Sequence, residues 1–305
     1  MTRTAGVLFA ASLLSLVPLS FAQQPEPTSQ AIISIQSKNP ITVKPSDLNI
    51  KVDDKNAQLT ALVPVAPTSV GIALLIDDGL RQSVGRELED IRRFINGLPP
   101  GTAILVGYMQ NGDVAVVKNF TTEHEDAANS VRIPLGSRGL SASPYFCISQ
   151  FVKRWPPVPG QAHIVLAITD GVDPYNGSVS VMNQDSPYVA ATVHDAQMAG
   201  VPVYSMYFTD AGIRGGAASF SGQSYLAQLA EGTGGQAFYQ GTGNPVSMTP
   251  FLADFQRAVS ESYFATFPAP ISKNLVRFKA STKLPKTKVY APEEVAPPTM
   301  GEPAS

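Results

Sequence analysis

Cysteine, histidine and charged residues are scarce in this 305-residue chain, and each scarcity excludes a class of protein. With one cysteine, Cys147, the chain can form no internal disulfide, so its fold must be stable from the hydrophobic core alone. There are three histidines, none spaced to meet a nucleophile, and no phosphate loop or metalloprotease motif, which argues against an enzyme. Charged residues make up 15% without a basic cluster, which argues against a nucleic-acid partner.

Long apolar runs are also lacking, except at the very start of the chain. Residues 1–22 combine Arg3, an apolar stretch and the small-residue ending Ser20-Phe21-Ala22, which together predict a cleaved signal peptide. The alternative is a membrane anchor, but Pro18 and the small residues favour cleavage. We therefore expect a soluble, exported protein, periplasmic or secreted, with no transmembrane segment after cleavage.

What the chain does have is 44% hydrophobic residues in regular patterns. Continuous apolar runs predict strands that are covered on both faces, and apolar residues at helical spacing predict helices between them. The expected strands are residues 70–76, 103–109, 114–120, 163–169, 201–208 and 237–239. The expected helices are residues 81–96, 124–131, 145–152, 188–200, 225–231 and 250–263. Strands that alternate with helices in this way indicate an α/β fold with a doubly wound, mostly parallel sheet.

The parallel sheet should have one antiparallel edge strand, because Asn111-Gly112 is a strong hairpin signal. Alternating segments outside the α/β pattern, at residues 31–37, 48–52, 275–280 and 286–290, predict small flanking β segments. We hypothesise that these flanks meet as one β module into which the α/β domain is inserted, so that Ile35 and Phe278 lie on the same side of the molecule.

The expected division of the chain follows from these patterns. It consists of a signal peptide (1–22), a leader and β segment (23–68), the α/β domain (69–263), a second β segment (264–290) and a disordered tail rich in Pro, Glu and Ala (291–305).

Acidic residues follow two of the predicted buried strands. Asp77 and Asp78 end the run GIALLIDDG, and Asp170 and Asp173 follow the run HIVLAITDGVD. The carboxyl ends of parallel strands meet at one edge of a sheet, where α/β proteins bind ligands. A simpler interpretation is that Asp77 and Asp78 only cap the following helix, because carboxylates are favoured near a helix N-terminus.

With these motifs, in this order, residues 69–263 resemble a von Willebrand factor A-type domain. The resemblance rests on the strand ending in Asp77, the Asn111-Gly112 hairpin, the sequences ITDG and VPVYSMYF, and the stretch LAQLAEGTGG. The chain is similar, more narrowly, to the von Willebrand factor A-related acidobacterial domain proteins, and SDLNIKVDDKNAQ looks like their N-terminal segment. The resemblance implies a protein-binding module of adhesion or assembly.

The resemblance also implies a site for a divalent cation, usually Mg²⁺, with the ligand set Asp-x-Ser-x-Ser, a Thr and a second Asp. In this sequence Asp77 takes the first position and Asp170 the last, and Ser141 falls near the Thr position. Both serine positions are changed, to Gly79 and Arg81. The resemblance therefore implies a degenerate metal site.

Two interpretations of this site remain open. In the first, Mg²⁺ still binds through Asp77, Ser141 and Asp170, with water, Asp78, Asp173 or Ser143 replacing the lost hydroxyls. In the second, the Arg81 guanidinium replaces the metal as the counter-charge of Asp77 and Asp170, and the site becomes metal-independent.

The two long segments at residues 173–187 and 210–223 should rise at the same edge of the sheet as the acids. Their Gly, Ser, Asn and Tyr residues are typical of adaptable binding loops, although variable surface loops would look similar. We expect an exported, non-enzymatic protein-binding module that engages a protein or peptide partner at this edge. A structural subunit of an envelope or secretion complex is the alternative, and a hydrolase is not expected.

Overall fold

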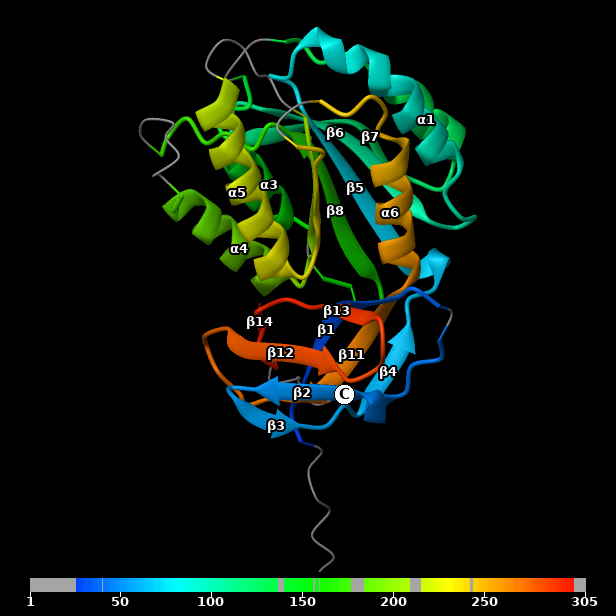
Figure 1. Cartoon of the computed structure of the whole chain (residues 1–305), viewed down its shortest axis with the longest axis vertical. Helices are drawn as coiled ribbons and strands as arrows, with labels where there is room; N and C mark the ends of the chain where they lie inside the picture. Colours follow the sequence, from blue (N-terminus) through cyan, green and yellow to red (C-terminus); the bar gives the residue numbers. More distant parts are fainter. Residues whose placement is uncertain are drawn as a thin grey trace, which may run out of the picture.

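The computed structural model describes residues 26–298, except residues 40, 137–139, 156, 159, 177–183, 209–214 and 242–243. The predicted signal peptide and residues 299–305 lie outside the described part. Within the described part, no helix is both long enough and apolar enough to cross a membrane. Figure 1 shows an α/β domain with a smaller β module below it.

The α/β domain is built on a six-stranded sheet with the strand order β10-β9-β8-β5-β6-β7. All of its neighbouring strands are parallel except β6 and β7, which are joined by the predicted hairpin, with positive φ angles at Asn111 and Gly112. The strands are β5 (Val70–Asp77), β6 (Ala103–Gln110), β7 (Asp113–Thr121), β8 (Ala162–Thr169), β9 (Val203–Tyr207) and β10 (Ala237–Phe238). The fold is therefore the predicted doubly wound α/β fold with one antiparallel edge strand.

Helices cover both faces of this sheet, which explains why its central strands are apolar throughout. Alternate residues of β5 enter the two cores: Ile72 and Leu74 pack into one, and Ala73 and Leu75 into the other. The first core is closed by α1 (Leu88–Asn96), α2 (His124–Ser130) and α6 (Thr249–Ser260). The second is closed by α3 (Pro144–Lys153), α4 (Pro187–Ala199) and α5 (Gly215–Thr233).

The flanking β segments form one module, as hypothesised. One sheet has the order β13-β1-β11-β4 and the other β14-β12-β2-β3, so each combines strands from both ends of the chain. Ile35 and Phe278 lie in the same buried core, where the rings of Phe267 and Phe278 stack at 4.5 Å. The strands are β1 (Thr28–Ser37), β2 (Leu48–Val52), β3 (Lys55–Ala57), β4 (Ala61–Pro64), β11 (Ser262–Pro268), β12 (Val276–Thr282), β13 (Thr287–Tyr290) and β14 (Glu294–Val295).

The module lies at the amino edge of the six-stranded sheet (Figure 1). The short 3-10 helix η2 (Pro67–Ser69) connects β4 to the start of β5, and α6 leads directly into β11. The Val65 N–H donates to the Ser262 carbonyl at 3.0 Å, so the chain enters and leaves the α/β domain at neighbouring points. The opposite, carboxyl edge of the sheet is left for the predicted site.

Four sequence predictions are wrong in detail. The predicted helix 81–96 is a 3-10 helix, η3 (Gln82–Glu87), followed by α1. The predicted helix 250–263 ends at Ser260, because the aromatic, alternating segment that follows pairs with β1 as β11. The predicted loop 210–223 is helical from Gly215 onward, and residues 210–214 lie outside the described part.

The fourth correction concerns the tail. The segment predicted to be disordered from residue 291 packs against the rest of the protein as far as residue 298. Glu294 and Val295 pair with β12, and Val295 is buried in the core of the β module. The Ser29 hydroxyl also donates to the Ala296 carbonyl at 2.9 Å. The composition of this segment predicted disorder wrongly, because the burial of one apolar residue, Val295, is enough to anchor a short Pro- and Glu-rich segment.

Candidate functional site

The predicted acids meet at the point where the winding of the sheet reverses. β5 and β8 are neighbours, but the chain leaves β5 toward α1 on one face and leaves β8 toward α4 on the other. Such a reversal opens a crevice at the carboxyl ends of the two strands. Ile76 lies beside Ile168 in this pair, so Asp77 and Thr169 follow at the same level.

Asp77 is almost completely buried at 4% exposure and is surrounded by donors from its own chain. Its Oδ1 accepts a hydrogen bond from the Gly79 N–H at 2.9 Å, and its Oδ2 accepts one from the Thr169 hydroxyl at 2.8 Å. The Ser141 hydroxyl donates a third. Burial raises the pKa of Asp77, and these three donors reverse the effect only in part.

Asp78 is fully buried and is neutralised by a guanidinium. Arg132 binds it through both ends, Nη1 to Oδ1 at 2.7 Å and Nη2 to Oδ2 at 2.8 Å. The Leu135 N–H and the Gln110 side-chain amide also donate to the carboxylate. Burial acts to raise the pKa of Asp78, but these bonds outweigh it and hold the pKa below its usual value.

Arg132 is itself held in place. Its guanidinium carbon lies 3.8 Å from the centre of the Tyr108 ring, a cation–π distance. The Tyr108 hydroxyl donates to the Arg132 carbonyl and accepts from the Arg132 N–H, both at 2.7 Å. The loop between α2 and α3 is therefore fastened to the end of β5.

A guanidinium does neutralise one buried acid at this edge, but the guanidinium is that of Arg132 and the acid is Asp78, which lies outside the predicted pair of Asp77 and Asp170. Arg81 precedes η3 with an exposed side chain. The donors found on Asp77 are Gly79, Thr169 and Ser141. A pairing of Arg81 with Asp170 stays a prediction.

The two predicted serines lie on the turn that starts α3. Between them, Ala142 has a φ of 62°, an unusual left-handed conformation for a residue other than glycine. The Ser143 hydroxyl is buried and makes no cap to α3; it is one of four buried side-chain polar atoms in the described residues without a hydrogen-bond partner. Ser141 thus belongs to the Asp77 cluster, and Ser143 offers an unused polar group beside it.

Asp170 is half-buried at the end of β8, in a loop clamped from two sides. Its Oδ1 accepts from the Val172 N–H at 3.0 Å, and the Tyr145 hydroxyl donates to the Gly171 carbonyl at 2.7 Å. On the other side α5 passes so close at Gly222 that a Cβ there would lie 2.0 Å from the Asp170 carbonyl oxygen. This contact requires glycine at 222.

Asp173 is buried and has a structural role. Its Oδ2 accepts from the Ser186 hydroxyl at 2.8 Å and its Oδ1 from the Tyr175 N–H at 3.2 Å. The Ser186 oxygen in turn caps the start of α4 by accepting from the N–H groups of Tyr188 and Val189. Asp173 therefore orients a helix cap.

The residues present do not fit the implied Mg²⁺ site. Magnesium requires about six oxygen ligands in octahedral geometry. Gly79 and Arg81 supply no side-chain oxygen, and both oxygens of Asp77 already accept hydrogen bonds. In the part of the chain that the structure describes, no group of three or more His, Cys, Asp or Glu side chains could hold a metal.

Two residues of this cluster escaped the sequence predictions. Thr169 stands immediately before Asp170, and aligning the two apolar runs would have placed it beside Asp77. Arg132 comes from a loop 54 residues beyond Asp78 in the chain, and no spacing or periodicity points to it.

Large apolar side chains are exposed around this edge of the sheet. They lie on the α2–α3 loop that holds Asp78 and on the segments that follow β8, β9 and β10. Six of the fourteen exposed large hydrophobic residues described fall there: Ile133, Leu135, Tyr175, Phe220, Tyr239 and Val246. We call these six residues the apolar rim. Exposed apolar side chains on several segments at the same edge of a sheet are available to contact a partner.

The three histidines lie away from this edge. His124 Nε2 is 2.8 Å from the Thr102 carbonyl, before the start of β6. His163 opens β8 and stacks on Trp155 at 4.1 Å, and burial lowers its pKa. His194 lies on α4 beside Asp195. Each histidine has a local structural contact, so none is placed to serve the carboxylate cluster as a base.

No family model and no curated protein matches this sequence. Among solved structures, it is similar to BatB from Bacteroides thetaiotaomicron, with 13% identity and a TM-score of 0.44 over 63% of this chain and 98% of that one. An aerotolerance-related membrane protein from Bacteroides fragilis has 14% identity and a TM-score of 0.40, over 63% and 99%. The VWA domain of SpRpn10 has 10% identity and a TM-score of 0.37, over 60% and 93%.

Likenesses this distant carry no conclusion about what this chain binds. The fold rests on the observed strand order, and membership of the acidobacterial family stays a prediction.

Proposed function

We propose that this chain is an exported, non-enzymatic binding module that engages a protein or peptide partner at the carboxyl edge of its sheet, through a degenerate metal site. The observation that carries the proposal is the contrast between the acids and their surroundings. Asp77 and Asp78 are buried and satisfied by their own chain, whereas the apolar rim around them is exposed. A surface of this kind suits the apolar side chains of a partner.

The proposed binding does not depend on a divalent cation. Arg132 supplies the positive charge that a metal would otherwise bring to the end of β5, and it does so permanently because a guanidinium stays protonated. Export is supported by the predicted signal peptide.

The test uses the purified protein as bait for envelope proteins of the source organism, with and without EDTA. Leu135→Glu with Tyr175→Glu places two charges on the apolar rim and should abolish capture of the bound protein, because burying unpaired carboxylates opposes association. Ile271→Glu is the matched control. It changes an equally exposed apolar side chain, at 57% against 60% and 56%, outside the apolar rim.

We expect the wild-type protein and the control to retain the same partner with and without EDTA. Loss of the partner in EDTA would instead favour cation-dependent binding through Asp77, Ser141 and Asp170. Retention by the Leu135→Glu, Tyr175→Glu variant would place the binding surface elsewhere on the molecule.

A further inference from the structure

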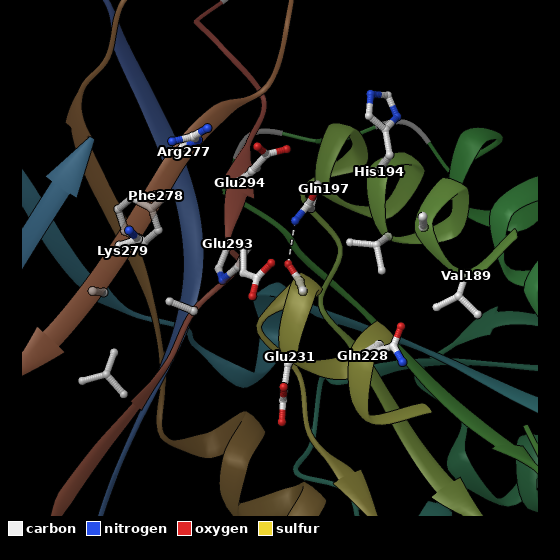
Figure 2. A pocket seen from close by; sticks show the side chains of 17 residues that line it. Val189, His194, Gln197, Gln228, Glu231, Arg277, Phe278, Lys279, Glu293 and Glu294 are labelled. Atoms are coloured by element: carbon white, nitrogen blue, oxygen red, sulfur yellow. Dashed lines mark hydrogen bonds between the residues drawn. The ribbon is translucent and has the colours of Figure 1, made fainter. Parts of the chain in front are cut away.

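A second candidate site lies at the opposite end of the molecule, in a groove of about 900 Å³ between the α/β domain and the β module. Figure 2 shows α4 and α5 on one side of the groove and β12 with residues 291–294 on the other. This volume lies in the range of sites for small ligands. The groove shares no residue with the carboxylate cluster or the apolar rim.

Glutamates from both domains line this groove. Glu231 lies in the last turn of α5, whereas Glu293 precedes β14 and Glu294 begins it. The Glu293 N–H donates to the Gly232 carbonyl at 3.0 Å, which joins the end of α5 to the last segment of the chain. In the view of Figure 2, the side chains of Glu294, Glu293 and Glu231 follow one another along the groove.

The positive side chains that line the groove are paired elsewhere. Arg277 and Lys279 of β12 both pair with Asp54, at 3.3 and 3.0 Å. His194 of α4 lies 3.8 Å from Asp195. In the part of the chain that the structure describes, no ion pair engages the three glutamates. The groove therefore offers uncompensated negative charge to a cationic ligand.

A nearly buried amide adds a neutral acceptor to the groove. Gln197 of α4 is 5% exposed, and its side-chain N–H donates to the Gly232 carbonyl at 2.7 Å, the bond drawn in Figure 2. The side-chain oxygen of Gln197 accepts no hydrogen bond from the described residues. Because buried polar atoms are almost always hydrogen-bonded, this oxygen calls for an N–H or O–H donor that the chain itself does not supply.

The walls between these polar groups are apolar. Ala190 and Val193 line the groove on the side of the α/β domain, and Ala280 and Val289 on the side of the β module; all four are at least partly accessible. A ligand that fits both features combines positive charges with aliphatic stretches. A metal ion does not, and the described residues hold no group of three His, Cys, Asp or Glu side chains that could bind one.

We propose that this groove binds a linear aliphatic polyamine. Its ammonium groups pair with the carboxylates of Glu231, Glu293 and Glu294, and one of its N–H groups donates to the Gln197 oxygen. Its methylene segments lie against the apolar wall of α4 at Val193. Aliphatic amines are protonated at neutral pH, as lysine is, so the groove recognises charge and shape together.

The probe is spermidine, a linear amine with three ammonium groups, added to the full protein in a ¹⁵N NMR titration. We expect the backbone amides of Gly232, Ala280 and Glu293 to shift together and to saturate. Putrescine, which has one ammonium group fewer, should bind about threefold more weakly because one exposed ion pair is missing. An uncharged aliphatic diol of the same length should not bind, and Mg²⁺ at the same concentration should not displace spermidine.

Paired charge variants locate the site. Glu231→Gln with Glu293→Gln should weaken spermidine binding about fivefold, because two exposed ion pairs are lost. Glu89→Gln with Glu125→Gln removes the same charge from exposed positions on α1 and α2 and should leave binding unchanged. The proposal is wrong if spermidine does not bind, if it binds both variants equally, if Mg²⁺ displaces it, or if it shifts the amides around Asp170 instead of those of the groove.

Discussion

The two edges of the central sheet differ in whether their carboxylates are buried or exposed. At the carboxyl edge the acids of β5 are buried and satisfied within the chain, and the exposed side chains around them are apolar. At the amino edge the groove between α4, α5 and β12 is lined by carboxylates, of which Glu231 and Glu293 are exposed. The first edge suits an apolar partner surface, and the second, where three glutamates line the groove, suits a polar one.

The carboxyl edge also shows two ways of burying an acid side by side. Asp77 is surrounded by neutral donors, and its pKa rises. Asp78, the next residue, faces a bidentate guanidinium, and its pKa falls. Neutral donors therefore leave part of the cost of burial uncompensated, whereas a full counter-charge overcomes it.

Arg132→Met tests the contrast between Asp77 and Asp78 directly and should have the largest effect on stability. It leaves the buried carboxylate of Asp78 without its counter-charge, and we expect a loss of about 3 kcal/mol in the free energy of unfolding, the low end for such pairs because Arg132 is partly exposed. Urea unfolding measures this loss. Arg154→Met, which breaks the exposed pair with Asp113, should cost no more than about 1 kcal/mol.

The loss of unfolding free energy in the same variant should depend on pH. Because the folded-state pKa of Asp78 is lowered, the stability from this pair is present above the unfolded value of about 4 and is lost as the pH falls through the folded value. The difference between wild type and Arg132→Met should therefore shrink in acid. A difference that stays constant down to pH 2 would mean that packing, and not charge, holds Arg132.

Gly222→Ala should have the next largest effect. The added Cβ would lie 2.0 Å from the Asp170 carbonyl oxygen, so α5 and the loop after β8 must separate, at a cost of about 2 kcal/mol. Gly85→Ala is the control, because its Cβ would meet Ile133 at an ordinary 3.5 Å. Equal unfolding free energies for the two variants would show that α5 does not clamp Asp170.

Thr169→Val tests the neutral donors around Asp77 and should cost about 1 kcal/mol at pH 7. The raised folded-state pKa of Asp77 contributes stability at low pH that is lost as the pH rises through that value. Removing a donor to the carboxylate raises this pKa further, so the loss should be larger at pH 7 than at pH 3.

The control for this prediction is Ser205→Ala. It removes a buried hydroxyl that has no hydrogen-bond partner in the described structure, and it should cost nothing measurable. A loss that is the same at both pH values for Thr169→Val would indicate that the hydroxyl bond does not act on the charged form of Asp77.

The sequence predicted the parts of this site that depend on local pattern. Two apolar runs ending in acids were enough to place Asp77 and Asp170 on neighbouring strands at the winding reversal. Arg132 could not be predicted, because a contact 54 residues away depends on how the α2–α3 loop returns over the sheet. β11 was missed because no glycine or proline separates it from α6.

The insertion of the α/β domain into the β module has a consequence for folding. β1, near the start of the chain, pairs with β11, so Thr28 finds its partner Pro268 only after the whole inserted domain has been synthesised. Until then the apolar side of β1, with Ile33 and Ile35, is without its sheet. Pairing at such sequence separation is slow, and exposed strands of this kind aggregate. The α/β domain can fold first and bring the two ends of the β module together, so its folding rate limits how long β1 stays exposed.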